Sequence, residues 1–175
     1  KLPDVNDARA VALGIVRALG HLHGLGVTHG DVKPDNVLLG ADGRARLADF
    51  ETARDHGGAV LTHTVIIDGG GIRATPQYAD PEVLKGARPT PAADVYSLGC
   101  TMEAMAHERP WGKEPLWVAL VAKLKAVDPA KRPTIAAVAQ DALFNGLPAE
   151  PTLAAAQLAK PLYWEGRSHQ GPRTV

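Results

Sequence analysis

The chain of 175 residues is 45% hydrophobic and has equal numbers of basic and acidic side chains, so its formal net charge at pH 7 is zero. This length and hydrophobic content suffice for one globular domain with a buried core and exclude wholesale disorder. The balanced charge gives no global electrostatic reason to expect nucleic acid or an anionic membrane as partner, so any phosphate binding must depend on local side chains.

Cysteine content and the absence of targeting signals point to the inside of a cell. Cys100 is the only cysteine, which excludes an intramolecular disulfide and fits a buried side chain in a reducing compartment. No apolar run approaches the roughly 18 residues of a membrane span, and the first residues lack a signal-peptide pattern. We expect an intracellular, cytoplasmic protein, with the nucleus left open. Because the chain begins with Lys1 instead of methionine, we also expect that its true N-terminus lies upstream or was removed.

The first predicted element is an amphipathic helix over residues 7–25, whose apolar side chains recur at three and four. Asp4 or Asn6 is placed to cap its start, and Gly24 is expected to take the left-handed conformation after its end. His21 and His23 lie near that end. Side chains two positions apart point to different helix faces, so we do not expect the two histidines to share a metal.

A polar loop follows the helix and is the most informative stretch of the chain. The pair Asp42-Gly43 is a strong hairpin signal between short apolar strands at 37–39 and 44–48. A hairpin would return its two ends to the same place, so polar groups before and after it should face one cavity. Those groups are Asp31, Lys33, Asn36 and Asp49.

The remainder of the chain is predicted to be irregular at first and then helical. Residues 55–74 are rich in glycine and are interpreted as a loop, and residues 75–82 as a turn-rich segment stiffened by proline. Helices are predicted at about 82–86, 92–107, 116–127 and, after a cap at Thr134, up to about 144. We assign residues 1–146 to one domain and 147–175, which contain four prolines and a possible helix near 152–159, to a partly irregular extension.

In this order the segments resemble the C-terminal lobe of a eukaryotic-type protein kinase of the Ser/Thr class, over residues 7 to about 144. The family's H-x-D-x-K-x-x-N pattern stands at residues 29–36, and its D-F-G pattern is similar to Asp49-Phe50-Glu51. Three later blocks also resemble the family: the segment 75–82, the helix beginning at Asp94, and the closing sequence DPAKRPT at 128–134.

The resemblance implies an α+β fold that is mainly α-helical, with a small β-hairpin carrying the catalytic and metal-binding loops. It also implies phosphoryl transfer from ATP, in which the protein positions the hydroxyl and neutralises phosphate charge. Asp31 would orient the substrate hydroxyl, and Lys33 would contact the transferred phosphate, as in the Ser/Thr-specific members. Asn36 and Asp49 would bind Mg²⁺, with Mn²⁺ as an alternative, and Leu38 would lie beneath the adenine.

Six further residues are expected in supporting roles: His29, Phe50, Thr75, Glu82, Asp94 and Arg132. By resemblance, Thr75 would contact the catalytic Asp and Lys beside the substrate, and Asp94 would hydrogen-bond the backbone of the catalytic loop. Glu82 would pair with Arg132. If that pair is buried, removal of one partner should cost about 3 to 5 kcal/mol.

The chain departs from the family pattern at three positions. Gly30 replaces the arginine of H-R-D, so we expect weak dependence on phosphorylation of the following loop, although Thr62 and Thr64 are candidate sites. Glu51 replaces the glycine of D-F-G, and its carboxylate could repel the metal-binding one by about 1 to 4 kcal/mol, an effect that a cation would offset. Asp80 replaces the alanine of A-P-E, a change that we expect to matter less.

The resemblance therefore implies a serine/threonine protein kinase that acts on a protein substrate and needs an N-terminal lobe from upstream sequence, because no Gly-rich loop or V-A-I-K lysine precedes residue 7. A catalytically silent kinase-like binding module is the alternative, given Glu51, the missing lobe and a short interval at 111–124 where the family has an additional helix. A small-molecule kinase of the aminoglycoside or choline type also uses H-G-D, but the blocks at 75–82 and 128–134 argue against it.

Overall fold

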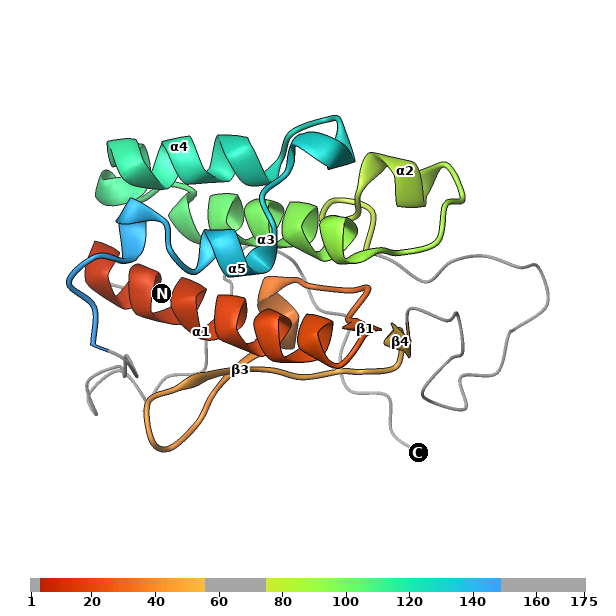
Figure 1. Cartoon of the computed structure of the whole chain (residues 1–175). Coiled ribbons are helices and arrows are strands. Elements are labelled where there is room, and N and C mark those ends of the chain that lie inside the picture. Colours follow the sequence, from red (N-terminus) through yellow and green to blue (C-terminus); the bar gives the residue numbers. More distant parts are fainter. Residues whose placement is uncertain (1–3, 56–74, 149–175) are drawn as a thin grey trace, which may run out of the picture.

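The computed structural model describes residues 4–55 and 75–148, and within them three helices form the body of the molecule. These are α1 (Val5–Gly24), α3 (Pro91–Ala106) and α4 (Pro115–Leu124). Figure 1 shows α3 between the other two, with the β3 strand on the far side of α1. The predicted α+β fold with mainly helical content is present in this part of the chain, and our expectations for residues 56–74 and 149–175 lie outside it.

Helix α1 begins and ends at sequence signals that were only partly predicted. Asp4 caps its start, because its carboxylate accepts hydrogen bonds from Asn6 N at 2.7 Å and from Asp7 N at 2.9 Å. At the other end, Gly24 is the last helical residue and Leu25 follows as the cap. The left-handed backbone conformation belongs to Gly26, whose φ is 75°, so the assignment of that role to Gly24 was wrong by two residues.

Two small antiparallel sheets lie beside α1 and fix the ends of the polar loop. The strands β2 (Val37–Leu39) and β3 (Ala45–Leu47) form the predicted hairpin, with Val37 opposite Leu47. The strands β1 (Val27–Thr28) and β4 (Arg54–Asp55), which the sequence did not lead us to pair, form the second sheet. As a result, the segments just after β1 and just after β3 are both held against the helical body.

The core between α3 and α4 depends on close approach of the two helices. Trp117 and Leu124 of α4 are almost fully buried, as is Met102 of α3. A Cβ atom at Gly99 of α3 would lie 2.7 Å from Lys125 Cγ and 2.9 Å from Leu124 Cβ. Glycine at this position therefore allows α3 and α4 to pack without a gap.

Short helical turns complete the C-terminal half, and one predicted helix is much shorter than expected. The bounds are α2 (Pro81–Leu84), η2 (Pro110–Lys113), η3 (Pro129–Lys131), α5 (Ile135–Val138) and η4 (Ala142–Phe144). Thr134 caps α5 as predicted, but the helix does not continue to residue 144. The cause is Asp141, whose carboxylate accepts from Leu143 N at 3.0 Å and starts a new turn.

Cys100 lies inside the fold, on α3, as the sequence suggested. Its thiol is buried, and this burial raises the pKa of the thiol above its usual value. The environment is that of a structural side chain instead of a reactive thiolate.

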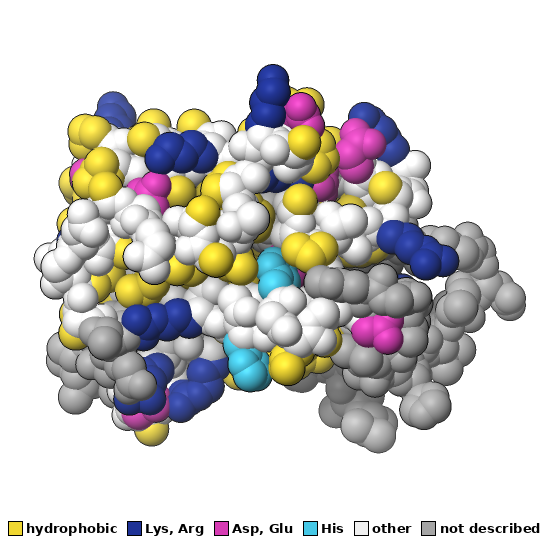
Figure 2. Space-filling view, viewed as in Figure 1, with side chains coloured by type: hydrophobic (Ala, Val, Ile, Leu, Met, Phe, Trp, Pro, Cys, Tyr) yellow, Lys and Arg dark blue, Asp and Glu magenta, His cyan; other side chains and the backbone are white. Residues whose placement is uncertain are grey.

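Charged side chains of both signs are interspersed with apolar and neutral ones on the described part of the face in Figure 2. This distribution matches the balanced composition and offers no extended single-sign field on that part of the surface. Among the helices that the structure describes, none has the length and apolarity to cross a lipid bilayer.

Candidate functional site

The polar loop after β1 is fixed by a buried carboxylate from α3. Asp94, which is 1% exposed, accepts hydrogen bonds from His29 N and from Gly30 N, each at 2.8 Å. Thr90 caps α3, because its hydroxyl oxygen accepts from Ala93 N at 3.3 Å, and this places Asp94 in the first turn of the helix. The predicted contact between Asp94 and the loop backbone is therefore present.

A third contact to Asp94 was not predicted. His23 Nε2 lies 2.9 Å from Asp94 Oδ2, and the histidine side chain is only 10% exposed. His23 thus joins the end of α1 to the start of α3 directly beneath the loop. The sequence signal was limited to a histidine near the end of a helix, and the register of two packed helices was needed to find its partner.

Asp31, Lys33 and Thr75 form a compact, partly buried group. Lys33 Nζ donates to an Asp31 carboxylate oxygen and, at 3.0 Å, to Thr75 Oγ1. Thr75 Oγ1 donates in turn to Asp31 Oδ1 at 3.0 Å, and Thr75 N lies 3.3 Å from the same oxygen. The expected contacts of Thr75 with Asp31 and Lys33 are present, and they join two segments 42 residues apart.

Asn36 and Asp49 are brought to the same end of the β2–β3 hairpin. The 3₁₀ turn η1 (Pro34–Asn36) leads into β2, and Ala48 N donates to Asn36 O at 2.9 Å. Asp49 is the next residue after this bond, as the hairpin predicted. The Asn36 side chain is buried and its amide nitrogen donates to Asp31 O at 2.8 Å, so its amide oxygen is left to accept or to coordinate.

The backbone at Asp49 is unusual, because its φ of 65° lies in the left-handed region that non-glycine residues rarely adopt. Its side chain accepts from Glu51 N at 3.3 Å. A carboxylate and an amide oxygen are hard ligands of the kind that Mg²⁺ uses together with substrate phosphates. Within the described residues no group of three His, Cys, Asp or Glu side chains converges as a metal cage.

Two large apolar side chains are exposed on this side of the molecule. Leu38 on β2 is 54% exposed, and Phe50 is 41% exposed. The Phe50 ring also lies against the buried His29 ring, with 5.2 Å between the ring centroids. The exposed position of Leu38 fits a surface beneath a flat ligand. The contact between His29 and Phe50 fits a supporting role for the catalytic loop.

The expected pairing of Glu82 with Arg132 is wrong. Arg132 instead forms a buried two-pronged ion pair with Asp80, whose side chain is 3% exposed. Glu82 pairs with Lys85 at 2.7 Å on the surface, where its side chain is 47% exposed. Asp80 precedes α2 as its cap and points inward, whereas Glu82 lies in the first turn and points outward. The substitution that we expected to matter less is thus the buried one.

The backbone conformation at position 30 favours glycine. Its φ is 85°, and a Cβ atom there would lie 3.1 Å from Thr52 O. We predict that Gly30→Ala lowers the free energy of unfolding by roughly 1 to 2 kcal/mol, measured by denaturant titration. The matched control is Gly20→Ala in α1, where a Cβ atom meets nothing within 4 Å and the change should stabilise by about 0.5 to 1 kcal/mol. Equal effects of the two changes would contradict this explanation.

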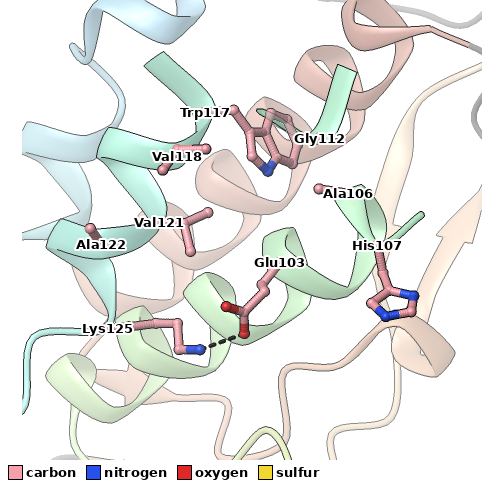
Figure 3. Close-up of a pocket in the computed structure, with 9 residues that line it drawn as sticks. All are labelled: Glu103, Ala106, His107, Gly112, Trp117, Val118, Val121, Ala122 and Lys125. Atoms are coloured by element: carbon pink, nitrogen blue, oxygen red, sulfur yellow. Dashed lines mark hydrogen bonds and ion pairs between the residues drawn. The ribbon is translucent and has the colours of Figure 1, made fainter. Parts of the chain in front are cut away.

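A separate cavity lies between α3 and α4, away from the polar loop (Figure 3). It has a volume of about 510 Å³ and is lined mainly by small apolar side chains, with the Glu103–Lys125 ion pair at one end. The turn η2 leads directly into α4, so the interval predicted to be short carries no further α-helix in the structure.

The family model described as protein kinase domain matches residues 3–118, which is more than half of the chain. The chain is 43% identical over 99 residues to the serine/threonine-protein kinase PknK of Mycobacterium tuberculosis, and this match covers 57% of the chain and 8% of the relative. It is 38% identical over 104 residues to the probable serine/threonine-protein kinase PkwA of Thermomonospora curvata, covering 59% of the chain and 13% of the relative.

A longer match extends beyond the region of the family model. The chain is 30% identical over 146 residues to serine/threonine-protein kinase drp72 of Corynebacterium efficiens, which covers 81% of the chain and 27% of that relative. The chain therefore spans roughly a tenth to a quarter of the length of these relatives. The catalytic-loop contacts, the hairpin that returns Asp49 to Asn36 and the family match agree with one another, and the chain belongs to the protein kinase family.

Proposed function

We propose that this chain is the C-terminal catalytic lobe of a serine/threonine protein kinase, which transfers the γ-phosphate of ATP to hydroxyl groups of a protein substrate. The observation that carries the proposal is the closed set of hydrogen bonds among Asp31, Lys33 and Thr75. These bonds hold the Asp31 carboxylate and the Lys33 ammonium group together. They also join both groups to Thr75, which belongs to a later segment of the chain. The kinase names of the bacterial relatives support the same reaction.

The proposed division of labour follows from which groups can accept a proton and which can neutralise charge. Asp31 accepts or orients the substrate hydroxyl proton, and Lys33 neutralises charge on the transferred phosphoryl group. Asn36 and Asp49 would hold the divalent cation, for which we propose Mg²⁺, with Mn²⁺ able to replace it. When bound, the cation supplies positive charge against the ATP phosphates.

ATP needs a second surface in this proposal. Leu38 and Phe50 are exposed on the side where adenine would lie, and an N-terminal lobe from upstream sequence would cover them. The protein to be assayed is therefore the full polypeptide that contains this chain. A bound N-terminal lobe would also remove two large apolar side chains from water, which is favourable for docking.

The alternative of a silent kinase-like module rests on Glu51, two residues after Asp49, on the short interval at 111–124 and on the N-terminal lobe that this sequence lacks. The alternative of a small-molecule kinase is disfavoured by Thr75, because that residue ties the catalytic pair to the segment expected to face a protein substrate. Both alternatives predict no phosphoryl transfer to protein hydroxyls.

The test is transfer of labelled γ-phosphate from Mg-ATP by the full protein to a mixture of Ser- and Thr-containing peptides, with Tyr peptides and choline or aminoglycoside alcohols assayed in parallel. We expect phosphoserine and phosphothreonine to be the products. Transfer to a small alcohol alone would support the hypothesis of a small-molecule kinase. ATP binding without transfer would support the hypothesis of a catalytically silent module.

A further inference from the structure

The buried Arg132 side chain is fixed by several hydrogen bonds and anchors the segment that contains Asp80. Its side chain is fully buried, and its guanidinium carbon lies 4.8 Å from the centroid of the Tyr96 ring. Nη1 donates to Asp80 Oδ2 and to Ala92 O, and Nη2 donates to Asp80 Oδ1 at 3.2 Å. The remaining bonds run from Nε to Ala126 O at 2.8 Å and from Nη2 to Val127 O at 3.2 Å.

These bonds use all five N–H donors that a guanidinium group possesses. A second carboxylate could bind Arg132 only by displacing one of the present acceptors. Glu82 is therefore excluded from this site in the observed arrangement, and its surface pair with Lys85 is of the exposed kind that contributes little.

A short, hydrogen-bonded path leads from Asp80 to the catalytic group. Tyr78 N and Ala79 N both donate to Thr75 O, at 2.9 and 3.1 Å, so the residues from Thr75 to Ala79 form a closed turn that ends at Asp80. Asp80 Oδ1 also accepts from Glu82 N at 2.9 Å and fixes the start of α2. At the other end of the turn, Thr75 Oγ1 bonds to Asp31.

We propose that Asp80, and not Glu82, is the positioning residue that holds Thr75, and through it Asp31, in register for phosphoryl transfer. This inference rests on the proposed function for its kinetic consequence, but its structural content does not. The Asp80–Arg132 pair fixes one end of the turn to η3 and α3, and a turn fixed at that end presents the Thr75 hydroxyl at one place. Loss of the Asp80 charge leaves Arg132 buried without its counter-ion and releases the turn.

The test compares Asp80→Asn with Glu82→Gln, because each replaces one carboxylate by an amide of the same size. Backbone hydrogen exchange of the full protein is the first measurement. We expect Asp80→Asn to lower protection of the amides at 75–79 by about tenfold or more and Glu82→Gln to leave it within about twofold. Loss of protection in Glu82→Gln, or unchanged protection in Asp80→Asn, would overturn the proposal. If Asp80→Asn does not fold, Asp80→Glu replaces it. Restored protection at 75–79 in that variant supports the need for a carboxylate at this position, whereas a loss of protection that is equal in α1 and at 75–79 rejects Asp80 as the anchor of the turn.

Kinetics provide the second measurement and separate positioning from general loss of structure. In Asp80→Asn, kcat with a peptide substrate should fall by about tenfold to a hundredfold, while KM for ATP changes by less than about twofold. Positioning by Thr75 should also raise the KM for the peptide. A purely structural role would reduce the amount of active enzyme and leave the KM values for ATP and for the peptide unchanged. A wild-type protein that transfers no phosphate would refute the proposed function, and the exchange comparison would still decide the role of Asp80.

Discussion

Asp31→Asn in the full protein is expected to lower the rate of phosphoryl transfer to a Ser/Thr peptide by about 10²- to 10⁴-fold, the usual contribution of a general base. The substituted amide keeps the size of the side chain but cannot accept the hydroxyl proton. It also loses the charge that holds Lys33, whose Nζ donates to the Asp31 carboxylate in the structure. The measurement is kcat and KM for peptide and for ATP under saturating Mg²⁺.

The matched control for this change is Asp35→Asn. Asp35 lies in the same loop, within η1, and is exposed. The same chemical change four residues away should therefore leave kcat within about twofold, because no reacting group depends on that carboxylate. Equal activities of wild type and Asp31→Asn would remove Asp31 from the catalytic role, and equal losses in both variants would indicate a general effect of charge.

Arg132→Met is expected to lower the free energy of unfolding by about 3 to 5 kcal/mol, the usual cost of removing one partner of a buried ion pair. Methionine fills much of the volume but leaves the Asp80 carboxylate buried, together with the carbonyl groups of Ala92, Ala126 and Val127. Domains of this size are stable by only about 5 to 15 kcal/mol, so the variant should lie close to the limit of folding. Urea titration followed by circular dichroism measures the change.

Arg46→Met serves as the comparison, since Arg46 also binds an aspartate with two nitrogens. Its partner is Asp42, with bonds at 2.7 and 3.0 Å, but the two side chains are 54% and 42% exposed. Solvent screening should make the loss there much smaller than the loss expected for Arg132→Met. A similar small loss for Arg132→Met would show that burial of the Asp80–Arg132 pair does not determine its contribution.

The local arrangement of the catalytic loop could be predicted because it depends on a motif with fixed spacing. The loop at 29–36 and the hairpin after it are local features, so the proximity of Asn36 and Asp49 follows from one turn signal at Asp42-Gly43. The contacts of Thr75 and Asp94 with the loop join segments far apart in sequence, and the family resemblance supplied them. Their observed distances near 3 Å agree with that expectation.

The incorrect or missing predictions concern side-chain partners and a helix end that depend on how the chain packs. Asp80 and Glu82 are only two residues apart, and the direction of each side chain depends on where α2 begins. His23 could be assigned to Asp94 only after α1 and α3 were packed together. Similarly, the end of α5 was set by the side chain of Asp141, which competes locally with continuation of the helix. The spacing of apolar residues gives little indication of such hydrogen bonds between a side chain and the nearby backbone.

The most direct test of the proposed catalytic centre is the dependence of phosphoryl transfer on Mg²⁺ concentration in the full protein and in Asp49→Asn. Glu51 lies two residues after Asp49, and the Asp49 backbone is in the left-handed region. We predict transfer by the wild type that requires a divalent cation and a fall of about a hundredfold or more in Asp49→Asn. Transfer that persists in a chelator, or that is equal in Asp49→Asn and wild type, would contradict the assignment.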